Sequence, residues 1–204
     1  MQLNPRLFRA RWWLLAVIVF LQLIVLVFSP SEKTLGTGIK PVYLHVSFTW
    51  TGMLLLTGTA LLGLVVLFSG NLMVSDRQRL LYQSALVFYL VGFLVSMYAS
   101  WLNWGGIPWQ EPKIQSAINV IVAASGAWYL REFIKPVRLK GLAGMIPFMF
   151  ISMSRSSPRM VLHPDNPVNS SPLGIRTTFL VMFVLAISLA VWFLWVRLGK
   201  ELEK

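Results

Sequence analysis

The chain contains only two histidines, and each stands where an imidazole could bind a ligand. His45 follows Tyr43 and Leu44 about one turn into an apolar stretch, whereas His163 precedes Pro164 in a polar segment. A neutral imidazole in apolar surroundings is a good iron ligand. The alternative is an interfacial histidine that hydrogen-bonds a backbone carbonyl, and the sequence leaves both interpretations open for both residues.

A second candidate feature is a tryptophan-rich loop that lies between the two histidines in the sequence. It holds Trp101, Trp104 and Trp109 together with Gly105, Gly106 and two prolines. Tryptophans gather at membrane interfaces, so an aromatic belt is one explanation, although a belt needs neither paired glycines nor prolines. Glycine lets the backbone approach a flat ligand, and indoles offer large faces for stacking. The loop therefore suits a porphyrin.

A porphyrin bound here would be held without a covalent bond. The chain has no cysteine, which excludes c-type haem attachment, iron–sulfur ligation and zinc–thiolate sites on this chain. The two propionates of a haem b would need cationic partners, for which Lys113, Arg155 and Arg159 are candidates. Solvated loop charges are the alternative for all three side chains.

These residues lie at the ends of long apolar runs. The chain is 56% hydrophobic and 12% charged, with a mean hydropathy of +0.69, and soluble domains do not have this composition. Crossing a hydrocarbon core takes about 20 residues. Five runs are clear spans, and a sixth is short and contains Pro147, so it must recruit flanking residues, kink, or enter without crossing. The runs are 13–28, 42–68, 80–102, 114–130, 139–154 (the short one) and 177–196.

The sequence thus predicts an all-α integral membrane protein of about six transmembrane helices, with residues 1–204 forming a single membrane domain. With six spans and the N-terminus inside, twelve of the eighteen basic residues fall on the inner side. The positive-inside rule therefore favours both termini inside. A five-span chain would instead put Arg197, Lys200 and Lys204 outside. The histidines and the tryptophan-rich loop are then expected on the outer face.

The motif Tyr43-Leu44-His45-Val46, followed by Trp50, resembles a motif of the CcmC/CcsA family of cytochrome c assembly proteins. Members of that family handle haem on the outer face of energy-transducing membranes, and this motif begins their second helix. The resemblance implies that His45 is an axial haem ligand.

The tryptophan-rich loop is similar to a tryptophan-rich motif of the same family, and the resemblance implies that it cradles haem. Trp109 is one place out of register, and the other middle tryptophans of the family motif are missing, so this cradle differs from the family's. The positions in register are Trp104, Gly105, Glu111 for an aspartate, Lys113 for an arginine, and Ser116.

The C-terminal part also resembles the family, in Pro147, Leu162-His163 and Ser171-Pro172-Leu173. Family members place a second ligating histidine shortly after the proline, but residues 148–153 contain none. The second axial ligand therefore stays open: His163, a thioether from Met149 or Met153, a five-coordinate iron, or no haem at all.

The leading hypothesis is a non-enzymatic haem-handling protein of cytochrome c maturation. It would capture haem b, stably or in passing, with His45 and the tryptophan-rich loop, and present it to other assembly proteins in the membrane. The simplest location is a bacterial cytoplasmic membrane, with the functional loops on the periplasmic side. The net charge of +11 is explained by topology and anionic lipid, so no nucleic-acid partner is expected.

Two other hypotheses come from different classes. One is a structural or accessory subunit of a larger membrane complex that keeps the fold without binding haem. The other is a permease component, which ranks last because the spans carry little polarity at membrane depth. The sequence has no Gly-rich phosphate loop and no paired carboxylates, so we do not expect an enzyme.

Overall fold

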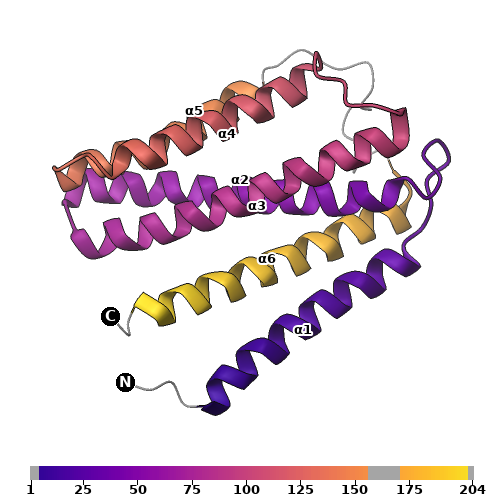
Figure 1. Ribbon diagram of the computed structural model, residues 1–204, viewed down its shortest axis with the longest axis horizontal. Coiled ribbons are helices and arrows are strands. Elements are labelled where there is room, and N and C mark those ends of the chain that lie inside the picture. Colours follow the sequence, from indigo (N-terminus) through magenta and orange to yellow (C-terminus); the bar gives the residue numbers. More distant parts are fainter. Residues whose placement is uncertain (1–4, 156–170, 202–204) are drawn as a thin grey trace.

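A computed structural model describes residues 5–155 and 171–201 of the chain, and these residues form six α-helices and no β-strand. The helices run alternately in opposite directions (Figure 1). One end of the molecule, here called the terminal end, holds the start of α1 and the end of α6. The opposite end, the loop end, holds residues 29–38 and 105–111. The bounds are α1 Pro5–Phe28, α2 Ile39–Ser69, α3 Leu72–Trp104, α4 Pro112–Arg131, α5 Val137–Arg155 and α6 Leu173–Glu201.

Specific residues end the helices and turn the chain. Gly70 ends α2 in the left-handed conformation at φ 65°, and the Asn71 side chain caps α3 by accepting a hydrogen bond from Val74. Gly105 ends α3 in the same way at φ 71°, with its N–H donating to the Trp101 carbonyl at 2.9 Å. Glycine adopts this conformation without a steric penalty, so both turns have a local cause.

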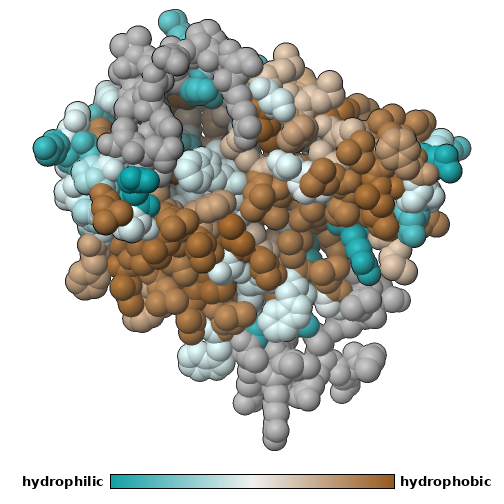
Figure 2. All heavy atoms as spheres, turned by 180° about the vertical axis from the view of Figure 1, so that it is seen from behind, coloured by the Kyte–Doolittle hydropathy of each residue, from teal (hydrophilic) through white to brown (hydrophobic). Residues whose placement is uncertain are grey.

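Within the described part of the chain, four helices are long and apolar enough to cross a membrane. They are Arg11–Phe28 within α1, Ile39–Ser69, Leu72–Trp104 and Leu173–Gly199 within α6. The other two helices, α4 and α5, form over the predicted segments 114–130 and 139–154 but are not in this set. Their crossing stays a prediction. In Figure 2, apolar side chains cover the middle of the visible face and hydrophilic ones gather toward its ends.

Helix α2 is the centre of the fold. It packs extensively on α3 and α5 and also contacts α6, whereas α1 packs mainly on α6. Tyr43 of α2 is fully buried, with its ring 4.7 Å from that of Phe179 and its hydroxyl donating to the Pro30 carbonyl at 3.0 Å. The tyrosine two residues before His45 is therefore a core residue that anchors the start of α2 against α6.

Candidate functional site

A pocket of about 80 Å³ opens at the loop end between the start of α2, the end of α3 and the start of α4. Three residues singled out from the sequence line it together: His45, Trp104 and Lys113. Each comes from a different helix, and each lies within about two turns of a helix end. The alternating helix directions bring these three ends to the same side of the molecule.

His45 is half-buried in the wall of this pocket. Its Nδ1 lies 3.0 Å from the carbonyl oxygen of Gly92 and 3.3 Å from Oγ1 of Thr49. The carbonyl contact agrees with the interpretation of His45 as an interfacial histidine. A histidine that ligates a metal commonly donates its other ring N–H to a backbone carbonyl, so the contact is equally compatible with a ligating imidazole.

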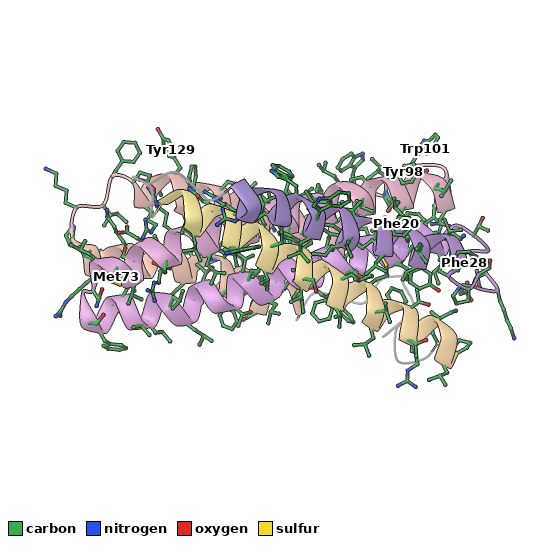
Figure 3. All side chains as sticks on the ribbon, turned by 90° about the horizontal axis from the view of Figure 1, so that it is seen from below. Phe20, Phe28, Met73, Tyr98, Trp101 and Tyr129 are labelled. Carbon is green, nitrogen blue, oxygen red and sulfur yellow. The ribbon has the colours of Figure 1, made fainter. Side chains whose placement is uncertain are left out.

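The tryptophans of the loop do not act together. Trp104 lines the pocket, whereas Trp109 is 57% exposed and does not line it. Trp101 projects from α3 beside Tyr98, away from the helix bundle (Figure 3). Gly105 is required by the left-handed turn that ends α3, and no atom of the described residues lies within 4 Å of the position its Cβ would take. One indole, rather than a shelf of three, faces the site.

Glu111 and Lys113 flank the first turn of α4 and differ in exposure. Glu111 is buried at the N-cap position, where a carboxylate is stabilised by the positive end of the helix dipole. Lys113 is exposed and lines the pocket. The burial of Glu111 is consistent with a role in starting α4, whereas Lys113 places a cationic side chain at the pocket.

Of the remaining candidates, some lie outside the described residues and the others lie away from the pocket. His163 and Arg159 lie outside the described residues, and so does the side chain of Arg155. Met149 and Met153 are 62% and 67% exposed on α5 and do not line the pocket. The question of a second axial ligand therefore stays open.

Several residues of the site were not singled out from the sequence. Tyr89, Ser96 and Ser100 of α3 line the pocket together with Trp104. They recur at helical spacing along one face, and this polar stripe on an apolar helix was a usable signal. Asn103 was also missed. Its Nδ2 donates to the carbonyls of Gly38 and Ala99 at 2.9 and 2.8 Å, which ties the end of α3 to the start of α2.

No protein-family model matches this chain, and no curated protein is significantly similar to it. The resemblance to the CcmC/CcsA family stays a prediction from the motifs.

Proposed function

We propose that this chain is a haem-handling membrane protein that binds haem b non-covalently at the loop end and passes it to an assembly partner in cytochrome c maturation. The observation that supports this is the convergence of His45, Trp104 and Lys113 on one pocket. An imidazole, an indole and an ammonium group match the three parts of a haem: the iron, the aromatic macrocycle and the propionates.

Each residue has a distinct role in this proposal. His45 ligates the iron through one ring nitrogen, Trp104 stacks on the macrocycle, and Lys113 neutralises a propionate. The bound group supplies the iron centre, while the chain supplies ligation, stacking and charge. No cysteine is present to form a thioether bond, so attachment to an apocytochrome belongs to a partner.

The size of the pocket bears on how haem would be held. At about 80 Å³ it is smaller than the roughly 300–1,000 Å³ of pockets that enclose a ligand. The donor set fits haem, but the volume fits only one edge of a macrocycle. Partial enclosure suits a protein that passes its ligand on, because an exposed edge is accessible to a partner.

The topology we propose has six crossings with both termini in the cytoplasm and the loop end outside. The alternating helices and the excess of basic residues at the terminal end support it. Helices α4 and α5 cross against the apolar neighbours α2 and α3, where burial in protein offsets their lower hydropathy. The simplest location remains a bacterial cytoplasmic membrane.

The test is a pyridine haemochrome assay with an absorption spectrum on detergent-purified protein from haem-replete cells. We expect haem to co-purify with the wild-type chain and with a Lys33→Gln surface control, and to be lost in His45→Ala. A colourless wild-type protein, or unchanged haem in His45→Ala, would overturn the proposal. His163→Ala, measured beside it, reports whether the second histidine contributes a ligand.

An accessory subunit without haem is the second candidate, and one observation favours it. Helix α1 packs mainly on α6 and leaves large apolar side chains exposed, among them Phe20 at 62% and Phe28 at 82% (Figure 3). Such a face could pack against a helix of another subunit. A colourless protein that co-purifies stoichiometrically with one membrane partner, and loses it on Phe20→Ala substitution, would favour this function.

A further inference from the structure

Helices α2 and α3 come into backbone contact beside His45, and two glycines make this possible. A Cβ atom on Gly92 would lie 2.5 Å from Oγ1 and 2.6 Å from the backbone nitrogen of Thr49. Reciprocally, a Cβ atom on Gly52 would lie 2.6 Å from the backbone nitrogen of Tyr89. Thr49 is one turn from His45, and Tyr89 lines the same pocket. The close approach of the helices is therefore part of the wall of the site.

The contact between His45 and Gly92 determines which ring nitrogen carries the proton. Nδ1 lies 3.0 Å from the Gly92 carbonyl oxygen, and a carbonyl can only accept a hydrogen bond. Nδ1 must therefore be the donor, and a neutral imidazole then has its lone pair on Nε2. The Thr49 hydroxyl, 3.3 Å from Nδ1, is a more distant second partner.

We infer that Gly92 is the positioning residue of the site: its carbonyl selects the Nδ1–H tautomer of His45 and so places the lone pair of the neutral imidazole on Nε2. The absence of a side chain at position 92 is what brings this carbonyl within reach, because any Cβ would push α3 away from Thr49. Hydrogen bonds from a ligating histidine to a carbonyl fix its tautomer and ring orientation in this way. The binding of a ligand at Nε2 rests on the proposed function, whereas the selection of the tautomer by Gly92 does not.

The test measures the tautomer in the haem-free protein. A chain carrying His163→Ala and labelled with ¹⁵N-histidine gives signals from His45 alone, at about pH 8 where a typical imidazole is neutral. We expect a protonated Nδ1 and an unprotonated Nε2. In Gly92→Ala the two nitrogen shifts should move toward each other as the second tautomer becomes populated. Gly126→Ala is the matched control, because its added Cβ would have no atom within 4 Å in the part of the chain that the structure describes.

Two further measurements test the role of Gly92: the tautomer in Thr49→Val and the haem affinity of Gly92→Ala. In Thr49→Val the tautomer should be unchanged, since the Gly92 carbonyl remains; a change there would assign the selection to Thr49. In the haem titration Gly92→Ala should weaken binding by about tenfold or more, the usual effect of losing such a partner. A protonated Nε2 in the wild-type protein overturns the inference, even if Gly92→Ala fails to fold.

The outcomes separate this inference from the proposed function. A fixed Nδ1–H tautomer that is lost in Gly92→Ala, in a chain that never binds haem, supports Gly92 and contradicts the haem proposal. Haem bound through His45 with the tautomer unaffected by Gly92→Ala contradicts the positioning role and leaves the haem proposal standing.

Discussion

Helix α2 crosses α3 near the loop end and α5 near the terminal end, and glycines permit both crossings. At the terminal end a Cβ on Gly63 would lie 2.6 Å from the Gly141 carbonyl oxygen, and a Cβ on Gly144 would overlap the Gln78 side chain. Gln78 fills this crossing, with its Nε2 lying 3.2 Å from the Thr59 carbonyl and 3.4 Å from that of Gly141. At the loop end, the crossing of Gly52 and Gly92 borders an open pocket instead.

The difference shows that close helix packing has two uses in this fold. Small residues let helix backbones approach each other, which is a main source of association between helices in a bilayer. Where a fully buried amide occupies the remaining space, the crossing is a packing contact. Where the space stays open and a histidine lines it, the same packing holds the candidate ligand His45 in place. If the two uses are distinct, substitutions at the terminal-end crossing should change stability, and substitutions at the pocket should change haem binding.

The largest effect is expected at the terminal-end crossing, from Gly141→Ala. The added Cβ would overlap the Gly63 carbonyl oxygen and lie 3.0 Å from the Leu67 nitrogen, and backbone atoms cannot rotate away. We expect a loss of about 3 kcal/mol in unfolding free energy, the upper part of the range for overpacking. Thermal unfolding in detergent measures it, with Gly126→Ala as control. Equal stability of the two variants would mean that this crossing is not tightly packed.

A smaller loss of stability is expected from Gln78→Ala. The substitution removes two hydrogen bonds to carbonyls, but it also removes a buried Oε1 that has no partner among the described residues. These effects oppose each other, so the net loss should be about 1–2 kcal/mol. Haem content should not change, because Gln78 is at the opposite end from His45. Loss of haem in Gln78→Ala, but not in the exposed control Gln115→Ala, would show that the crossings are coupled.

At the pocket beside the loop-end crossing, Lys113→Gln should alter binding without altering stability. Lys113 is exposed, and an exposed ion pair contributes about 1 kcal/mol or less, so we expect haem affinity to fall by roughly twofold to fivefold. Part of the salt dependence of binding should disappear with the charge. Haem titration at two ionic strengths measures both effects. If the surface variant Lys33→Gln weakens binding as much, the effect comes from overall charge.

The helices were largely predictable because apolar runs report directly on membrane spans. The runs 42–68, 80–102 and 177–196 each lie inside one observed helix. The helix ends were less predictable, since α3 begins at Leu72, well before its apolar run. Asn71 caps the helix at that point. The first turns of α3 contain polar residues, so a hydropathy pattern does not detect them. Hydropathy marks the apolar part of a helix rather than its ends.

The site was predictable as far as topology determines it. His45, Trp104 and Lys113 stand near helix ends that alternation of direction brings together, so their convergence follows from the order of the helices. The contact between His45 and Gly92 joins residues 47 positions apart and depends on how α2 and α3 are rotated against each other. Neither the motif nor the hydropathy contains that information. The outward orientation of Trp109 has the same origin, because it depends on the path of the loop.

The smallest effect is expected in the loop that leads into α2, and it tests whether the pocket depends on its surroundings. The Glu32 carboxylate accepts hydrogen bonds from the backbone N–H groups of Leu35 and Thr34 at 2.8 and 2.7 Å. The bond from Leu35 is the main cause of a lowered pKa for Glu32, below its usual 4.5. Because the pKa of Glu32 is lowered, the stabilisation of the loop by these hydrogen bonds is complete above pH 4.5. It is lost as the pH falls through the lowered pKa of the folded protein.

The Leu35 amide signal should therefore titrate in the NMR spectrum with a midpoint below 4.5, and Glu32→Gln should abolish the titration. Because Glu32 is not among the described residues that line the pocket, haem content at neutral pH should be the same in Glu32→Gln and the wild type. A loss of haem in this variant would mean that the loop, and not only the contact of α2 with α3, holds His45 in place.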